Sequence, residues 1–228
     1  MKNINEICIL VQARLSSERV PGKMLKPFAG TTLMDILFEK LKNSKIIKIK
    51  NVYLSAYEDE LKNLGKKYNI NIFHRSKKSS MSEGSPLYEM FEWHNKLPYK
   101  YVVKLNACNP FLKISTIDSF IQNFIKSEKE GSFAVVKKKN YFWDEKFKPI
   151  TDWKNLKIMN TKLINFTYEA AHCLDASRLD IIKDGYWIDI KIPANPNFFV
   201  IDEFEAYDID YEWQFEFYEK VYSILKSQ

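Results

Sequence analysis

Short apolar segments alternate with amphipathic segments along most of the chain, and this alternation restricts the possible folds more than any other feature. Parallel strands that are buried on both faces are continuous apolar runs, and they need a crossover between them that is usually helical. We predict strands at residues 7–11, 52–55, 70–73, 101–105, 133–136, 187–190 and 198–201, and helices at 32–41, 59–68, 87–93, 114–125 and 213–225. This order predicts an α/β fold in which helices flank a mainly parallel, twisted sheet.

The alternation breaks down between residues 137 and 166, a stretch rich in lysine and aromatic residues without a clear period. A structureless loop of that length is uncommon inside a compact domain. Its aromatic residues need cover, so we expect one domain spanning residues 1–228 in which residues 137–166 form a dimerisation arm of a homodimer. The alternative is a local β-extension within the same subunit. The aromatic residues in question are Tyr141, Phe142, Trp143 and Trp153.

Composition excludes several classes of protein. With 46% hydrophobic and 15% aromatic residues, the chain can bury a core, which excludes disordered and collagen-like chains. No apolar run approaches the roughly 18–20 residues that span a bilayer, and residues 1–6 lack the apolar part of a signal peptide. The three cysteines include no Cys-x-x-Cys pair, which argues against structural zinc. Together, these observations predict a cytoplasmic protein without a membrane partner.

The net charge of +6 comes mainly from lysines dispersed along the chain, so we expect solvated lysines and no nucleic-acid partner. The arginines are more informative because they are few. Arg14 and Arg19 share one loop, and Arg75 follows a predicted strand. A guanidinium group recognises phosphate or a base edge with a fork of donors that lysine lacks. These three arginines are therefore candidate functional residues.

The loop after the first predicted strand, residues 13–25, is the first candidate site. In α/β sheets, ligands bind where the carboxyl ends of the strands open into a crevice. Arg14, Arg19 and Lys23, with two serines and a Pro-Gly turn, supply the donors that a triphosphate requires. The loop has neither the Walker nor the Rossmann glycine pattern. The alternative is an ordinary basic surface turn.

The second candidate site is Asp208-Ile209-Asp210, shortly before the last predicted helix. In an extended segment, residues two apart point to the same face, so the two carboxylates can share a hard cation such as Mg²⁺. The alternative is a polar strand edge in which Asp210 caps the helix.

These two segments resemble the sugar-acid cytidylyltransferases, which make CMP-sialic acids and CMP-3-deoxy-manno-octulosonate. Residues 13–23 are similar to the family's Ala-Arg-x-x-Ser-x-Arg-x-Pro-Gly-Lys loop, and residues 207–210 to its Ile-Asp-Ile-Asp segment. The resemblance implies a nucleotide-diphospho-sugar transferase-like fold. It also implies that CTP phosphates bind Arg14, Ser17, Arg19 and Lys23, and that Asp208 and Asp210 hold Mg²⁺.

Two weaker similarities lie between these segments. Residues 104–112 are similar to the family's sugar-binding loop, which implies that Asn106 contacts the sugar acid. Cys108 occupies a position where several relatives carry a metal-binding aspartate, which favours the sialic-acid subgroup; the alternative is a buried small hydrophobe. Arg75 with residues 82–85 resembles the region that reads cytosine, which adds Gly84 and Ser85 to the expected CTP site. We expect His172 to be a structural residue, although it could face the sugar.

The resemblance implies transfer of CMP from CTP to the anomeric hydroxyl of a sialic-acid-like, nonulosonic-type α-keto sugar acid, with release of pyrophosphate. Legionaminic acid is the first expectation for this acceptor. Arg14, Lys23 and Asp210 are the expected catalytic residues. The alternatives are a GT-A glycosyltransferase, which also uses an Asp-x-Asp site, and a catalytically lapsed nucleotide-binding homologue. The interpretation requires Lys23 and Asp210 to lie close together in the folded chain.

Overall fold

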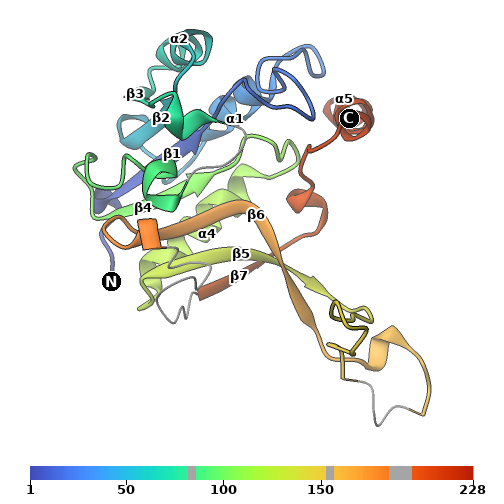
Figure 1. The fold of residues 1–228 in the computed structure, drawn as a ribbon. Coiled ribbons are helices and arrows are strands. Elements are labelled where there is room, and N and C mark those ends of the chain that lie inside the picture. Colours follow the sequence, from blue (N-terminus) through green and yellow to red (C-terminus); the bar gives the residue numbers. More distant parts are fainter. Residues whose placement is uncertain (82–85, 153–156, 185–196, 228) are drawn as a thin grey trace.

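The computed structural model describes residues 1–81, 86–152, 157–184 and 197–227. In this part of the chain, a seven-stranded sheet has the order β3-β2-β1-β4-β6-β5-β7 (Figure 1). The strands are β1 (Ile7–Gln12), β2 (Val52–Ala56), β3 (Asn71–His74), β4 (Tyr101–Leu105), β5 (Gly131–Lys138), β6 (Thr167–Arg178) and β7 (Asn197–Ile201). The α-helices are α1 (Leu33–Lys42), α2 (Asp59–Lys67), α3 (Leu87–Met90), α4 (Ile114–Lys126) and α5 (Glu212–Lys226).

The predicted fold class is confirmed. Six of the predicted strands and all five predicted helices are present with similar boundaries, while the strand predicted at residues 187–190 lies outside the described residues. β1 shows why the apolar runs are reliable signals, because five of its six residues are buried between the layers that cover the sheet. The Thr32 side chain accepts a hydrogen bond from the Asp35 backbone N–H and so fixes the start of α1.

β6 was not among the predicted strands, and it is the one described strand that runs against its neighbours. It pairs antiparallel with β4 on one side and with β5 on the other. Its first half is largely exposed, and its second half buries the polar side chains of Asp175 and Ser177. Neither an alternating nor a continuous apolar pattern results, so the periodicity that reveals the other strands is absent here.

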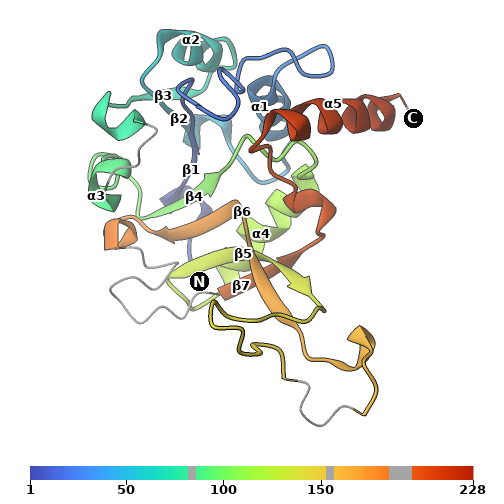
Figure 2. The ribbon, with the colours of Figure 1, turned by 45° about the vertical axis from the view of Figure 1, so that its right-hand side comes forward.

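Helices cover one face of the sheet, and shorter segments cover the other. Buried side chains of α1, α2 and α4 pack with β1, β2 and β4 in the largest core cluster. On the opposite face, Phe91 and Trp93 after α3 pack on Cys8 and Leu10 of β1. α5 lies beside the loop and helix that follow β1, as Figure 2 shows. It packs on them through Phe215 and Tyr218. None of the helices in the described ranges is long and apolar enough to cross a membrane.

The described parts of residues 139–166 extend from the ends of β5 and β6 away from the sheet (Figures 1 and 2). Strand pairing reaches only as far as Lys138 opposite Thr167. Trp143 is 52% exposed and Phe147 86% exposed, whereas Tyr141 and Phe142 are half-buried. Trp153 lies outside the described residues. The role of this segment in dimerisation stays a prediction.

Candidate active site

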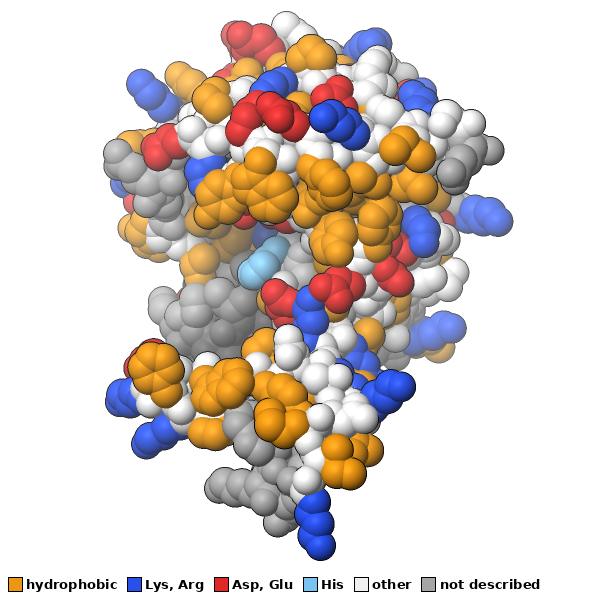
Figure 3. All heavy atoms as spheres, turned by 90° about the vertical axis from the view of Figure 1, so that its right-hand side faces the viewer, with side chains coloured by type: hydrophobic (Ala, Val, Ile, Leu, Met, Phe, Trp, Pro, Cys, Tyr) orange, Lys and Arg blue, Asp and Glu red, His pale blue; other side chains and the backbone are white. Residues whose placement is uncertain are grey.

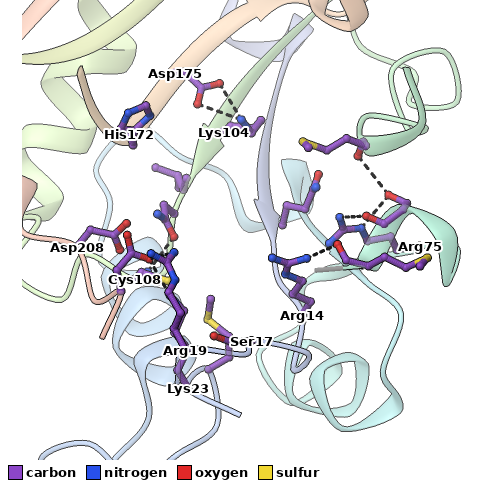
Figure 4. A pocket seen from close by; sticks show the side chains of 18 of the residues that line it. Arg14, Ser17, Arg19, Lys23, Arg75, Lys104, Cys108, His172, Asp175 and Asp208 are labelled. Carbon is purple, nitrogen blue, oxygen red and sulfur yellow. Dashed lines mark hydrogen bonds and ion pairs between the residues drawn. The ribbon is translucent and has the colours of Figure 1, made fainter. Parts of the chain in front are cut away.

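A cavity of about 530 Å³ opens at the carboxyl ends of β1 and β4. These strands are paired in parallel, with Val11 opposite Leu105, so the loops that follow them start at the same edge of the sheet. Figure 4 shows side chains from distant segments directed into this cavity. Its polar lining includes Gln12, Arg14, Ser17, Glu18, Arg19, Lys23, Arg75, Ser79, Lys104, Asn106, His172, Asp175, Asp208 and Asp210.

The expected convergence of the basic loop and the acidic segment is confirmed. Lys23 Nζ lies 3.8 Å from Asp210 Oδ1 and donates a 2.6 Å hydrogen bond to the carbonyl of Ile209, which is 186 positions away along the chain. Arg19 Nη2 forms a 2.6 Å ion pair with Asp210 Oδ1. Cations and carboxylates therefore meet at one side of the cavity, an arrangement that suits a polyphosphate and its counterion.

The basic loop is fixed by its own backbone and by one buried anchor. Gly22 adopts a φ of +64°, a conformation that glycine tolerates without strain, and its N–H donates to the Leu15 carbonyl. Val20 is fully buried against α1 and α5. Its backbone N–H donates to Ser17 Oγ at 3.3 Å. Ser17 therefore helps to shape the loop as well as lining the cavity.

Asp208 is a half-buried residue at the cavity wall, and one of its carboxylate oxygens is buried. Its Oδ1 has no hydrogen-bond partner among the described residues, and burial raises the pKa of this carboxyl group, while Lys23 opposes that change. An orphaned, acceptor-only oxygen beside a second carboxylate is a donor set that fits a hard cation such as Mg²⁺. No cluster of three or more His, Cys, Asp or Glu side chains that could hold a metal occurs in the described ranges. Two carboxylates are sufficient for Mg²⁺ when substrate phosphates supply further ligands.

Cys108 lies next to the acidic segment, but its thiol is not an oxygen ligand of the kind that Mg²⁺ prefers. It is 4% exposed, and burial raises the pKa of its thiol to about 12, so the sulfur carries its proton at neutral pH. Its carbonyl accepts a 3.1 Å hydrogen bond from the Ile209 N–H. The alternative interpretation of Cys108 as a small buried residue is confirmed, while the subgroup that it favours stays a prediction. Its backbone also holds the acidic segment in place.

Arg75 and Arg14 line the opposite wall of the cavity and donate hydrogen bonds to the segment at residues 79–81. Arg75 is only 7% exposed; its Nε donates to Ser79 Oγ at 2.9 Å, and its Nη2 donates to the Ser79 carbonyl. Burial and the nearby Arg14 lower the pKa of Arg75 to about 10. Arg14 Nη1 donates to the Met81 carbonyl. Both arginines line the cavity while holding residues 79–81, and the predicted CTP contacts Gly84 and Ser85 lie outside the described residues.

Asn106 directly follows β4 and lines the cavity, while its contact with the sugar acid stays a prediction. Its Oδ1 accepts a 3.0 Å hydrogen bond from the Cys108 backbone N–H, which closes the turn after the strand. The side chain therefore has a local structural role as well as a place in the site.

Several residues of the cavity were not among the predicted site residues, and Lys104 and Asp175 are the two that interact inside it. Lys104 and Asp175 form an ion pair inside it, with Nζ 3.1 Å from Oδ2. His172 is exposed and lines the cavity, a position that agrees with the alternative that it faces the sugar, while its role stays a prediction. The backbone of His172 has a φ of +53°, next to a register shift in the pairing of β5 and β6. Lys104 lies on a predicted strand, whereas Asp175 and His172 lie on β6 and could have been signalled only by recognising β6 as a strand.

Comparison with proteins of known sequence connects this site with nucleotide transfer. The chain is 26% identical over 134 residues to 3-deoxy-manno-octulosonate cytidylyltransferase of Rickettsia felis, covering 58% of this chain and 52% of that protein. It is 24% identical over 125 residues to the spore coat polysaccharide biosynthesis protein SpsF of Bacillus subtilis, covering 52% of this chain and 50% of that protein. The chain thus spans about half the length of these curated relatives.

A third relative aligns over nearly its whole length. The post-translational flagellin modification protein B of Campylobacter coli is 21% identical over 229 residues, with coverage of 95% of this chain and 94% of that protein.

Among solved structures, CMP:2-keto-3-deoxy-manno-octonic acid synthetase complexed with CTP superposes with a TM-score of 0.71 at 11% identity, covering 96% of this chain and 99% of that one. At that identity the likeness shows the fold alone. The sequence model of the family described as Cytidylyltransferase matches residues 8–182, which include the basic loop, Arg75, Asn106 and His172. This match covers most of the chain, and we conclude that the protein belongs to the cytidylyltransferase family, a family of nucleotidyltransferases.

Proposed function

We propose that the protein transfers CMP from CTP to the anomeric hydroxyl of a sialic-acid-like α-keto sugar acid and releases pyrophosphate. The observation that carries this proposal is the contact of Lys23 and Arg19 with Asp210 at one side of a single cavity. The name of one relative, 3-deoxy-manno-octulosonate cytidylyltransferase, supports an acceptor that is a sugar acid.

The basic loop would bind the triphosphate. Phosphoryl-type transfers depend on positioning and charge neutralisation more than on covalent help from the protein. Arg14 and Lys23 would neutralise the charge that develops on the departing pyrophosphate, while Ser17 and Arg19 would hold the phosphates in place. Arg75 lies at the other wall, where a buried guanidinium with Gly84 and Ser85 would complete a site for cytosine.

Asp208 and Asp210 would hold Mg²⁺, which supplies Lewis-acid stabilisation of phosphate charge when it is bound. The orphaned Oδ1 of Asp208 supports this assignment. Arg19 and Lys23 balance the charge of Asp210. Asn106 would contact the acceptor from the end of β4, and the neutral thiol of Cys108 fits the sialic-acid subgroup better than relatives with an aspartate at that position.

A screen for pyrophosphate release tests the proposed function. Each of the four common ribonucleoside triphosphates is incubated with Mg²⁺ and a panel of eight- and nine-carbon keto sugar acids. We expect release with CTP and a nine-carbon acceptor, and formation of the CMP-sugar by mass spectrometry. CTP binding without turnover on the whole panel would instead support the alternative of a lapsed homologue. The family match leaves no support for the GT-A alternative.

A further inference from the structure

The ion pair between Lys104 and Asp175 lies in a part of the cavity that is separate from the basic loop. Figure 4 shows it near His172 and away from Ser17 and Lys23. Lys104 Nζ lies 3.1 Å and 3.3 Å from the two Asp175 oxygens. The side chains are 20% and 9% exposed, and both line the cavity. The pair is therefore largely desolvated, yet it borders the cavity in which we propose that the substrates bind.

Stability does not explain why this pair is there. A buried ion pair loses much of its attraction to the cost of desolvating two charges, so apolar residues of similar size often serve a fold as well or better. The two strands are already joined by backbone pairing from Tyr101 opposite Arg178 to Leu105 opposite Leu174. Charged groups held inside a ligand cavity are typical of functional sites.

The chemistry of the pair selects the kind of group that can bind to it. The ammonium group donates and the carboxylate accepts, and the pair as a whole has no net charge. An anionic group would meet the like charge of Asp175, and a cationic group would meet that of Lys104. A neutral group with an adjacent donor and acceptor meets both without repulsion, and an amide supplies them as its N–H and C=O.

The surroundings of the pair favour an amide that carries a small apolar group. The Phe91 ring lies under Lys104, with the ring centroid 5.0 Å from Nζ, and Met90 and Leu105 also line the cavity. These side chains offer an apolar wall for the methyl group of an acyl chain. A hydroxyl group would use the polar pair but not this wall.

We propose that Lys104 and Asp175 form a subsite that recognises an acylamino substituent of the acceptor. Lys104 donates to the acyl oxygen, Asp175 accepts from the amide N–H, and Phe91 contacts the acyl methyl group. This assignment rests on the proposed function and deepens it, because it names the substituent that the enzyme uses to select its sugar acid.

Two nine-carbon keto sugar acids that differ only in an acetylamino or a hydroxyl group at one carbon test this subsite. We expect the wild-type protein to favour the acetylamino acid by about 10- to 100-fold in kcat/KM. This is the size of effect expected when the other acid leaves buried polar groups of the site without hydrogen-bond partners. In the double variant K104M/D175L, the ratio should fall to within about threefold of unity while the KM for CTP stays unchanged. The double change avoids an unpaired buried charge.

Two further variants separate recognition from folding. Lys104→Arg keeps a charged donor and should keep the preference. Lys138→Met is the matched control: its ammonium is also paired, with Glu169 at 3.1 Å and with Glu203, but it does not line the cavity. It should leave the ratio unchanged.

A wild-type ratio near unity would overturn the subsite whether or not the variants fold, and so would a folded double variant that keeps the preference. CMP transfer to an eight-carbon acid but to neither nine-carbon acid would overturn the subsite and leave the nucleotidyl transfer standing. Absence of CTP turnover with every acceptor would contradict the proposed function itself.

Discussion

Lys23 connects the two ends of the chain through one ammonium group. It donates to the Ile209 carbonyl, approaches Asp210, and opposes the effect of burial on the pKa of Asp208. Its side chain is only 12% exposed, so solvent screens these interactions less than those of a surface lysine. A single residue thus helps to hold the acidic segment and offers charge to a phosphate.

Loss of this ammonium group should impair catalysis more than folding. A charge-assisted hydrogen bond contributes about 1.5–3 kcal/mol, so we expect Lys23→Ala to lower kcat/KM by about 10- to 150-fold. Lys26→Ala is the control, because Lys26 directly follows the same loop but pairs with Glu212 on α5. Steady-state kinetics check the pair, and a loss below about threefold for Lys23→Ala would contradict its role.

Asp208 is expected to show a conflict between stability and function. Burial raises the pKa of Asp208 above its ordinary value, so the folded state favours the protonated carboxyl group. Ionisation of this group therefore lowers the stability of the folded protein, and this loss is complete above the folded-state pKa. Asp208→Asn should therefore raise the Tm at pH 7 by about 2–4 °C, the shift expected for about 1 kcal/mol. The gain should shrink as the pH falls towards the ordinary pKa, and activity should be lost. Thermal melts at several pH values measure this, and an unchanged or lower Tm at pH 7 would contradict it.

At the level of elements, the acidic segment is held by the turn between β4 and α4. Glu205 is 5% exposed, and its Oε2 accepts a 3.0 Å hydrogen bond from the Lys113 N–H at the start of α4. The Asn109 side chain donates to the Ala206 carbonyl at 3.0 Å, and the Ile209 N–H donates to Cys108. These bonds set the position of Asp208 and Asp210 relative to Asn106.

Glu205 should therefore act as a positioning residue. Glu205→Ala leaves a buried donor unsatisfied, and we expect it to cost about 1–3 kcal/mol of unfolding free energy together with a fall in kcat. Glu205→Gln keeps an acceptor of the same length and should recover most of both losses. Denaturant unfolding and pyrophosphate release measure the two effects; equal losses in the two variants would show that the hydrogen bond is not what matters.

The same elements show what the sequence could reveal. β1 and α4 are visible because their apolar residues follow the period of a buried strand or an amphipathic helix. The loop after β1 and Asp208–Asp210 are visible because their chemistry is concentrated in a few neighbouring residues. The pairing of Lys104 with Asp175 is not visible, because it depends on the register of two strands whose residues are 71 positions apart, and one of these strands lacks a clear pattern.

At the scale of the molecule, the described parts of the arm carry apolar side chains that a single subunit leaves exposed. Phe147 is 86% exposed and Met159 78% exposed. Surfaces of this kind are typical of interfaces between proteins. We therefore expect a homodimer in which residues 137–166 contact the second subunit.

Light scattering after size-exclusion chromatography checks this expectation. The wild-type protein should have the mass of a dimer, and the variant F147D/M159D that of a folded monomer. Phe217→Asp, a change at another exposed aromatic residue on α5, should remain dimeric. A wild-type monomer, or a dimer that the arm variant leaves intact, would show that the arm has another role.

The central claim is that the basic loop and the acidic segment bind one CTP molecule between them. A crystal structure of the protein with CTP and Mg²⁺ tests it most directly. We predict triphosphate oxygens within hydrogen-bond distance of Lys23 Nζ and of the Arg14 guanidinium, with a cation that joins Asp208 and Asp210 to the same phosphates. A triphosphate bound elsewhere, with Lys23 still engaged only with Ile209 and Asp210, would contradict the account.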